Sequence, residues 1–350
     1  MTAATVPPSG STDATTDPRR ALGAALRAWA AGGSAEIGVV RVLDRHGFGT
    51  VESGQLVAST AAGESAGVLY LGALDDTALP LAASSVARPR TGQAHVTEEA
   101  GVAAGLACAG GATLLGHPLP AALATALGDA LEAGVPAALL TPADGSSVLV
   151  LTGPALEQVH GSLGSAEVDE AACDTARNRL RRGATTTERF DAAGIDVLLD
   201  LWVPVPTLVV VGAGAIGEAL RAQAALLGWG TRSVSELAEA REAVAGFSDA
   251  DVVVLLDHAA KFDAMLIDGV RGRGFIGALG SRRTQAARRG RLQVKGLTDE
   301  EIDSIYGPVG LDLGARTPAE TAVSIVAQVI AARSGRAATA LSASDSRIGG

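Results

Sequence analysis

Short apolar strands alternate regularly with amphipathic helices after Pro206, and this pattern constrains the fold more than any other feature of the sequence. Apolar runs predict strands at residues 207–211, 230–234, 252–256 and 275–279. Helical spacing predicts helices at 216–227 and near 237–244, and capping boxes at Thr298/Glu301 and Thr317/Glu320 predict two more. Such alternation is typical of a parallel, doubly wound sheet, so we predict a Rossmann-like domain over residues 205–336.

A glycine-rich loop joins the first of these strands to the first helix. Gly212 permits a tight turn, Gly214 lets a pyrophosphate approach the backbone, and Gly217 lets the helix pack closely on the strand. Ile216 begins the helix, whose N-terminus supplies free N–H groups and a positive dipole end. This context predicts dinucleotide binding, and a Rossmann fold without a ligand is the alternative.

The acidic residue that usually holds the adenosine ribose is missing from the end of the second strand. That stretch contains Arg232 and Ser233, and Glu236 follows where a helix is expected to begin. Arg232 suits a phosphate better than a ribose hydroxyl, although a solvent-exposed role explains it equally well. The sequence therefore leaves the form of the nucleotide open.

Eight basic residues lie within 25 positions without an intervening acid, in a chain of net charge −10. Gly280, Ser281, Arg282 and Arg283 follow a predicted strand, so we expect them at the carboxyl edge of the sheet, where doubly wound folds bind ligands. Arginine binds phosphate in a bidentate manner, and we predict an anion site there. For Arg288, Arg289 and Arg291 a solvated helix face is the simpler interpretation. The cluster is completed by Arg271, Arg273 and Lys295.

The first half has a less regular pattern and is interpreted as an α/β domain. Residues 1–16 are expected to be a disordered tail, 17–170 the N-terminal domain, 171–204 a connection and 337–350 a second disordered tail. Within this half, helices are predicted from Pro18 onward and at 120–133. Strands are predicted at 37–43, 55–59, 68–72, 137–141 and 148–152, with a further strand in the connection at 195–202.

Composition excludes several classes of protein. The acidic balance, with a pI of about 5.0, argues against general nucleic-acid binding. Two cysteines, Cys108 and Cys173, are too few for a disulfide framework or a multi-cysteine zinc site. The longest apolar stretch, 201–217, is short for a membrane span and is broken by prolines and glycines. We therefore expect a cytoplasmic protein with no membrane span.

Motifs in the second half resemble those of the XdhC/CoxI family. The block from Phe275 to Arg283, F-I-G-A-L-G-S-R-R, resembles the family's G-[FY]-I-G-x-L-G-S-R-R. The block from Pro308 to Pro318 resembles P-[IV]-G-L-D-[IL]-G-[AS]-x-[TS]-P and contains Asp312. The glycine loop falls where the family has G-A-G-x-[VI]-G. The resemblance is strong over residues 205–336 and weaker over 35–170.

This resemblance implies a role in maturing molybdenum hydroxylases such as xanthine dehydrogenase or CO dehydrogenase. It implies binding of molybdenum cofactor, as molybdopterin or molybdopterin cytosine dinucleotide, and help with its sulfuration and insertion. The implied partners are an apo molybdenum hydroxylase client and a cysteine desulfurase, and a homodimer is expected. The implied cofactor-binding residues are Gly212, Gly214, Ile216, Gly217, Arg232, His258, Gly280, Ser281, Arg282, Arg283 and Asp312.

The sequence also departs from the family pattern. The cysteine of an S-G-G-C block corresponds to Ala73, and the histidine before the last signature corresponds to Tyr306. Where the family has T-H-D-H-x-x-D, this chain keeps His258 and Asp263 but has alanine in place of the inner aspartate and the second histidine. Cys108 matches a second family cysteine and is the candidate catalytic thiolate, or else a small buried side chain. Metal candidates are Cys108, His258 and Asp263.

Two other classes of function remain open. An NAD(P)-dependent oxidoreductase would use the glycine loop, but the sequence has no Tyr-x-x-x-Lys pair, catalytic His–Asp arrangement or acidic ribose ligand. A docking scaffold without a ligand would need none of the candidate residues. We lean toward a maturation factor that is not itself an enzyme.

Overall fold

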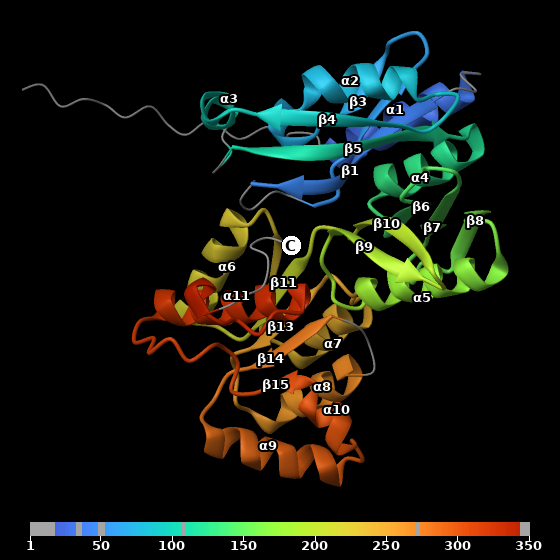
Figure 1. Ribbon diagram of the computed structural model, residues 1–350. Helices are drawn as coiled ribbons and strands as arrows, with labels where there is room; N and C mark the ends of the chain where they lie inside the picture. Colours follow the sequence, from blue (N-terminus) through green and yellow to red (C-terminus); the bar gives the residue numbers. More distant parts are fainter. Residues whose placement is uncertain are drawn as a thin grey trace, which may run out of the picture.

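The computed structural model describes residues 18–32, 37–47, 53–104, 106, 109–270 and 274–343. Three sheets are stacked along the molecule, with the N-terminal sheet A at the top of Figure 1 and the C-terminal sheet C toward the bottom. Sheets A and B are antiparallel, and sheet C is parallel. The predicted fold class, an α/β first half followed by a Rossmann-like parallel-sheet domain, is confirmed.

Sheet A has the strand order β3-β2-β1-β5-β4. Its strands are β1 (Ile37–His46), β2 (Val57–Thr60), β3 (Ser65–Gly67), β4 (Arg90–Val96) and β5 (Gly110–Leu119). Helix α2 (Asp75–Ser84) covers one face, where Val40 packs with Ala78 and Ala82. A short helix, α3 (Glu98–Ala103), follows β4 and is capped by Thr97. Successive residues of a strand face opposite sides of the sheet, so Val39 lies on the other face of sheet A, in the core that sheet A shares with sheet B.

Helices α1 (Pro18–Ala31) and α4 (Ala121–Ala133) form the layer between sheets A and B. Leu26 of α1 and Leu127 of α4 are fully buried there, together with Leu139 of sheet B. Sheet B has the order β8-β7-β6-β10-β9, and helix α5 (Ala166–Leu180) covers its other face. Its strands are β6 (Ala137–Pro142), β7 (Val148–Thr152), β8 (Gln158–Ser162), β9 (Thr186–Ala192) and β10 (Ile195–Trp202).

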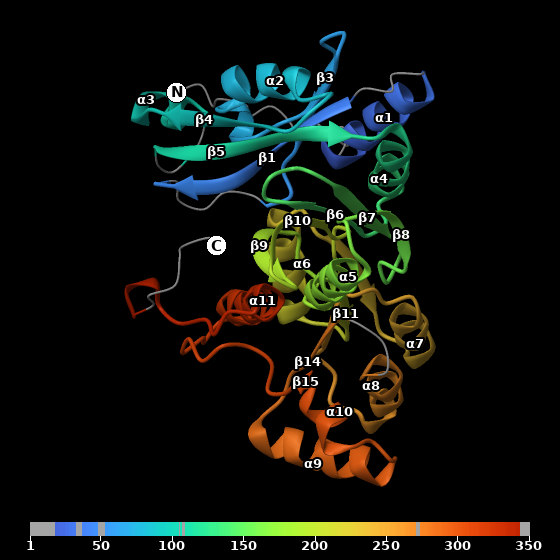
Figure 2. The same ribbon diagram turned by 45° about the vertical axis from the view of Figure 1, so that its right-hand side comes forward.

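Sheet C has the order β12-β11-β13-β14-β15, so the chain reverses its direction of winding between β11 and β13. Helices α6 and α11 cover one face, and α7, α8 and α9 cover the other (Figure 2). The strands are β11 (Thr207–Val211), β12 (Gly230–Val234), β13 (Val252–Leu255), β14 (Phe275–Ala278) and β15 (Ile305–Tyr306). The helices are α6 (Ala215–Leu226), α7 (Leu237–Ala245), α8 (Asp263–Val270), α9 (Arg282–Val294), α10 (Asp299–Asp303) and α11 (Pro318–Ser334).

Both predicted capping boxes are present. The Thr298 and Thr317 hydroxyls accept from the N–H groups of Glu301 and Glu320, respectively. Each glutamate side chain in turn accepts from the backbone N–H of its threonine. One strand prediction is wrong. Residues 68–72 form no strand, because Tyr70 and Leu71 take positive φ angles of 53° and 56°, which are incompatible with an extended chain; Tyr70–Gly72 is assigned to a 3-10 turn. The strand of this region is β3, which ends at Gly67.

The segment 171–204, expected as a connection, holds most of α5 and strands β9 and β10. β10 coincides with the predicted strand and pairs with β6 in the middle of sheet B. The first predicted tail, 1–16, lies outside the described residues, and residues 337–343 of the second end in a 3-10 helix, η3 (Leu341–Ala343). How the chain divides into domains stays a prediction. No helix within the described ranges has the length and apolar character that crossing a bilayer demands.

A fully buried ion pair joins sheets A and B. Arg41 of β1 donates from Nε to Oδ2 of Asp200 in β10 at 2.6 Å, and neither side chain is exposed. Arg41 Nη2 also donates to the carbonyl oxygens of Leu139 and Leu198, both at 3.0 Å. The Thr187 hydroxyl donates to the other oxygen of Asp200. Since both partners are hydrogen-bonded on several sides, the pair fixes how the two sheets face each other.

His117 of β5 lies in the same buried layer. Burial, together with the nearby charge of Arg41, lowers the pKa of His117 to about 3. Its Nδ1 lies 2.9 Å from the Pro118 carbonyl oxygen, and its Nε2 has no hydrogen-bond partner among the described residues. The imidazole is therefore neutral in the folded protein at physiological pH.

We expect this histidine to make the fold sensitive to acid. The unfolded chain takes up a proton near pH 6.5, whereas the folded protein does so only near pH 3. The contribution of His117 to stability is therefore present above pH 6.5 and is lost as the pH falls, by about 1.4 kcal/mol per pH unit. Urea unfolding between about pH 5 and about pH 7 should show a smaller pH slope for His117→Leu than for the wild type. Equal slopes would contradict the prediction.

Candidate functional site

The predicted site residues follow different strands of sheet C but lie along one edge. The glycine loop follows β11, His258 follows β13, Gly280 and Ser281 follow β14, and Asp312 follows β15. Because these strands are parallel, their carboxyl ends meet at the same edge of the sheet. The glycine loop also lies at the point where the strand order reverses, the usual ligand position of doubly wound folds.

The geometry gives each glycine of the loop a separate role. Gly212 has a φ of 114° and donates its N–H to the Val234 carbonyl oxygen at 2.9 Å. Gly214 has a φ of 115°, and no atom of the described residues lies within 4 Å of the position that a side chain would occupy. A Cβ at Gly217 would lie 3.1 Å from a methyl group of Val210, so a side chain there would push α6 away from the sheet.

The N-terminus of α6 has no side-chain cap. Gly214 is the N-cap residue and has no side chain to accept a hydrogen bond from the first turn. Ile216 is half-buried against the core beneath the helix, so its position in the first turn is fixed. Uncapped N–H groups and the positive end of the helix dipole attract an anion. The open space at Gly214 leaves room for it.

Acidic and basic side chains are paired at the end of β12. Arg232 is exposed, and its Nη2 lies 3.7 Å from a carboxylate oxygen of Glu242. Glu236 is the N-cap residue of α7, as expected, and lies 3.9 Å from Nζ of Lys261. Arg232 and Glu236 each lie within 4 Å of an opposite charge but stay exposed, so the form of the nucleotide stays open.

The N-terminus of α9 carries two unpaired arginines. Gly280 has a φ of 139°, and the Ser281 hydroxyl accepts from the N–H of Thr284 at 3.2 Å as the N-cap. Arg282 and Arg283 are exposed, and neither forms an ion pair within the described part of the chain. Two cations at the positive end of a helix dipole repel it, at a cost of about 0.3–1 kcal/mol each. A bound anion would offset this cost.

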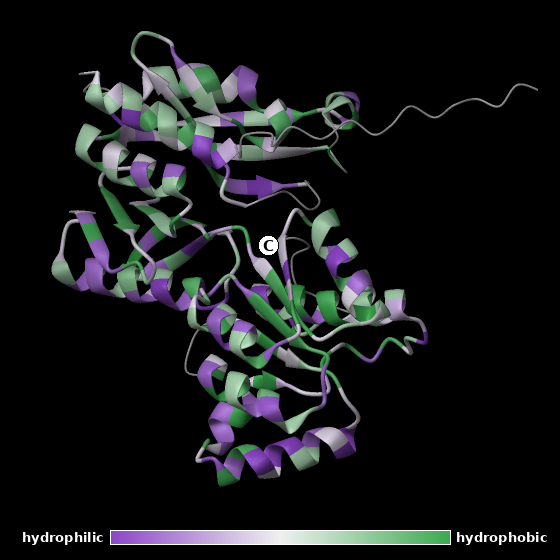
Figure 3. Ribbon diagram, turned by 180° about the vertical axis from the view of Figure 1, so that it is seen from behind, coloured by the Kyte–Doolittle hydropathy of each residue, from purple (hydrophilic) through white to green (hydrophobic). Residues whose placement is uncertain are grey.

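The solvated-face interpretation is wrong for Arg288. Although α9 is largely hydrophilic (Figure 3), the Arg288 side chain is only 3% exposed. Arg289 forms ion pairs with Asp299 at 2.7 Å and Asp303 at 2.5 Å. Although the basic segment contains no acidic residue, Asp299 and Asp303, which follow it in the sequence, neutralise Arg289. Arg271 and Arg273 lie outside the described residues.

The metal candidates are not assembled into a site in the described residues. Both oxygens of the buried Asp263 accept from Arg291, at 2.6 and 3.1 Å, and Lys295 lies 3.8 Å away. His258 is exposed in the loop after β13, and Cys108 lies outside the described residues. Over the described ranges, no group of three or more His, Cys, Asp or Glu side chains could hold a metal ion. The role of Cys108 stays a prediction.

Cys173 is buried and Asp312 is exposed. Cys173 is buried on α5, and burial raises the pKa of its thiol. Asp312 is exposed in the loop between β15 and α11, two residues after Gly310, whose φ is 115°. The neighbouring Leu311 is held by Ser324 of α11, whose hydroxyl donates to its carbonyl oxygen at 2.5 Å. The hydrogen bond to Ser324 therefore holds the backbone next to Asp312 in place, while the Asp312 side chain is exposed to solvent.

A parallel sheet with a glycine-rich loop at its switch point defines a Rossmann-type domain. Residues 208–329 match the family described as the XdhC Rossmann domain. This part of the chain belongs to that family, which confirms the resemblance inferred from the sequence motifs.

Two further comparisons extend over more of the chain. It is 29% identical over 227 residues to the uncharacterized protein YqeB of Escherichia coli (strain K12), a match that covers 55% of this chain and 40% of that protein. The chain thus spans less than half the length of this curated relative. A crystal structure from Bacillus halodurans, described as a xanthine dehydrogenase, aligns over 92% of this chain and 98% of its own, with a TM-score of 0.50 and 19% identity. That likeness shows the fold alone.

Proposed function

We propose that this protein is a maturation factor for a molybdenum hydroxylase and that it acts by binding the molybdenum cofactor. The observation that carries the proposal is the XdhC Rossmann domain at residues 208–329. The carboxyl edge of that domain presents two positive features, the uncapped N-terminus of α6 and the unpaired Arg282 and Arg283.

The donor set fits a phosphate-bearing pterin. Free N–H groups at a helix N-terminus and arginine guanidinium groups both bind phosphate, the latter in a bidentate manner. The first turn of α9 contains no acidic residue that would repel it. When bound, the cofactor would supply the molybdenum centre that the client needs, and this chain would hold its phosphate end. Molybdopterin cytosine dinucleotide carries its two phosphates joined as one diphosphate, and we propose that both features face that single group.

The wider proposal follows from the same family. A factor of this kind would hand the cofactor to an apo molybdenum hydroxylase and assist its sulfuration, with a cysteine desulfurase as the sulfur source. Cytoplasmic location and a homodimer belong to the same proposal. An NAD(P)-dependent oxidoreductase is the alternative that the open glycine loop favours, because NAD(P) also presents a pyrophosphate.

Deletion of this protein is expected to leave the client enzyme expressed but inactive. The purified client should contain little cofactor, or cofactor without its sulfur, because the factor acts on the cofactor. Complementation with the double variant Arg282→Ala/Arg283→Ala should restore less than about a tenth of the activity, since each charge-assisted contact is worth about 1.5–3 kcal/mol. The measurements are client activity, molybdenum content and cyanide-releasable sulfur.

A matched control removes two exposed arginines elsewhere in the same half of the chain. Arg221 lies on α6, and Arg241 on α7 pairs with Asp268 at the surface. The double variant Arg221→Ala/Arg241→Ala should restore activity as the wild type does. Clients that carry full, sulfurated cofactor in the deletion strain would defeat the proposal. Turnover of a small substrate with NAD(P) by the purified protein would then favour the oxidoreductase.

A further inference from the structure

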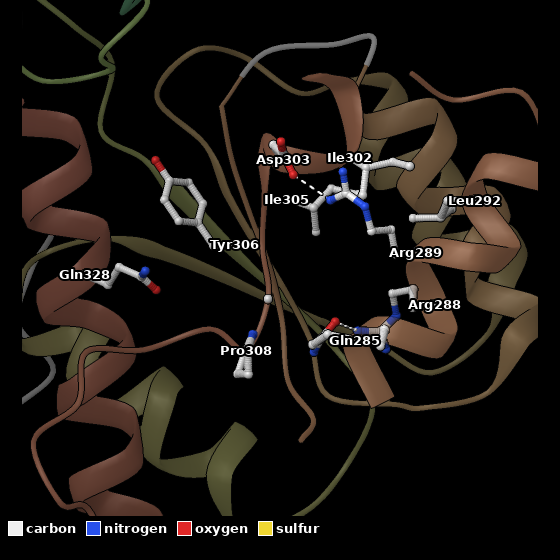
Figure 4. A pocket seen from close by; sticks show the side chains of 12 residues that line it. Gln285, Arg288, Arg289, Leu292, Ile302, Asp303, Ile305, Tyr306, Pro308 and Gln328 are labelled. Atoms are coloured by element: carbon white, nitrogen blue, oxygen red, sulfur yellow. Dashed lines mark hydrogen bonds and ion pairs between the residues drawn. The ribbon is translucent and has the colours of Figure 1, made fainter. Parts of the chain in front are cut away.

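A cavity of about 440 Å³ lies beside the edge strand β15 (Figure 4). Helix α9 contributes Gln285 and Arg288 to it, and α10 contributes Ile302. Tyr306 and Pro308 line it from β15 and the loop that follows, and Gln328 does so from α11. Its volume falls within the range of sites for small molecules.

Arg288 brings a buried charge to this cavity, and it forms no ion pair with any carboxylate of the described residues. Its side chain is 3% exposed, and Nε has no hydrogen-bond partner. The acids nearby are already engaged, because Asp263 is bound by Arg291, and Asp299 and Asp303 by Arg289. Burial lowers the pKa of Arg288, which shows that the charged form is poorly solvated there.

The guanidinium group is held in place from the sheet. Arg288 Nη1 donates to Oε1 of Gln285 at 2.6 Å, and Gln285 Nε2 donates to the carbonyl oxygen of Ala278 at 2.9 Å. A Cβ on Gly307 would lie 2.7 Å from the same Oε1, so the Gln285 amide fits tightly against the backbone. Figure 4 shows Gln285 and Arg288 joined at one side of the cavity. A fixed arginine head loses little entropy when it binds an anion.

The remaining lining is mixed and includes one flat surface, with Arg289, Asp303 and Gln328 beside the apolar side chains. The Tyr306 ring stacks on Phe275, with centroids 4.4 Å apart and planes 9° apart, and is 38% exposed. Leu292, Ile302 and Ile305 supply apolar side chains to the lining. Arg289 and Asp303 pair with each other at 2.5 Å, so Arg288 is the one charge in the described lining without an ion-pair partner. The apolar side chains favour an organic anion over a small inorganic one, because its body can displace water from them.

We propose that this cavity binds a small organic monocarboxylate with a flat apolar body, its carboxylate on Arg288 and its body against Tyr306 and the isoleucines. The site is separate from the glycine loop. β15 is three strands from β11 in sheet C, about 14 Å at the usual spacing. The inference therefore does not depend on cofactor binding.

Calorimetry with benzoate on the full chain tests this assignment. Benzoate should bind, and benzamide, its neutral analogue, should bind at least about tenfold more weakly, because a charge-assisted contact is lost. Arg288→Met should weaken benzoate binding by at least about tenfold, whereas Arg288→Lys should retain part of it. In buffer without added carboxylate, Arg288→Met should melt at a higher temperature than the wild type, because it removes a buried charge without a counter-ion. That readout is independent of binding and reveals a variant that fails to fold.

Three controls decide where benzoate binds. Arg241→Gln removes an equal charge from the surface and should leave benzoate affinity unchanged, as should Arg282→Ala/Arg283→Ala. Benzoate binding that is lost in the Arg282/Arg283 variant but kept in Arg288→Met would overturn the inference, and so would equal affinity for inorganic phosphate and benzoate. Failure of cofactor binding with intact benzoate binding would contradict the proposed function alone.

Discussion

Replacing Asp200 with alanine is expected to destabilise the protein by about 3–5 kcal/mol, the typical cost of leaving a buried charge without its partner. Arg41 would then lie between sheets A and B, fully buried, with hydrogen bonds to two carbonyl oxygens but no carboxylate. Urea unfolding followed by far-ultraviolet circular dichroism measures the loss of free energy.

Two variants make the result specific. Asp196→Ala breaks an exposed ion pair with Arg189 in the same sheet and should cost less than about 1 kcal/mol. The double variant Arg41→Met/Asp200→Leu should recover most of the stability lost in Asp200→Ala, because an apolar pair no longer leaves a buried charge. A loss for Asp200→Ala no greater than that for Asp196→Ala would show that the buried pair does not hold the two sheets.

Gly214→Asp is expected to abolish binding of a phosphate-bearing ligand, with a loss of at least about a hundredfold, or about 3 kcal/mol. The new carboxylate would enter the open space at the N-terminus of α6, where nothing lies within 4 Å of a Cβ. It would also cap the helix and occupy the positive end of its dipole in place of the ligand. Calorimetry with molybdopterin cytosine dinucleotide, and in parallel with NADP, measures the change.

Gly214→Ala is the matched control, because it imposes the same strain at a φ of 115° without adding charge. It should lower the melting temperature more than Gly214→Asp does, because it has no carboxylate to cap the helix, but it should weaken binding far less. If both variants bind as the wild type does, the glycine loop does not hold phosphate. If both lose binding equally, the backbone conformation of the loop matters and its charge does not.

The parallel sheet was largely predictable because its strands are apolar runs bounded by glycines and caps. Strands β11 and β12 have the predicted bounds, and β13 and β14 end one residue earlier than predicted. The N-terminal half was harder. Strand β5 contains glycines and a buried histidine, and β4 mixes exposed and buried residues, so neither shows a clear local pattern.

The candidate site was predictable only where the chain itself brings residues together. The glycine loop and the Gly280–Arg283 block each follow a strand, so their place at the carboxyl edge follows from parallel pairing. The burial of Arg288 was not predictable, because it depends on Gln285 and on residues from α10 and β15 that close over it. Asp263 looked like a metal ligand in the sequence, but its partner Arg291 lies 28 residues further on.

The pair that joins sheets A and B has a consequence for the order of folding during synthesis. Its two residues are 159 positions apart, and Asp200 lies on β10, the strand between β6 and β9. A ribosome that has completed sheet A has therefore supplied Arg41 but not its carboxylate, and sheet B still lacks an inner strand. The ion pair between sheets A and B therefore cannot form until β10 emerges, so the contact between the two sheets is completed long after the strands of sheet A have been synthesised.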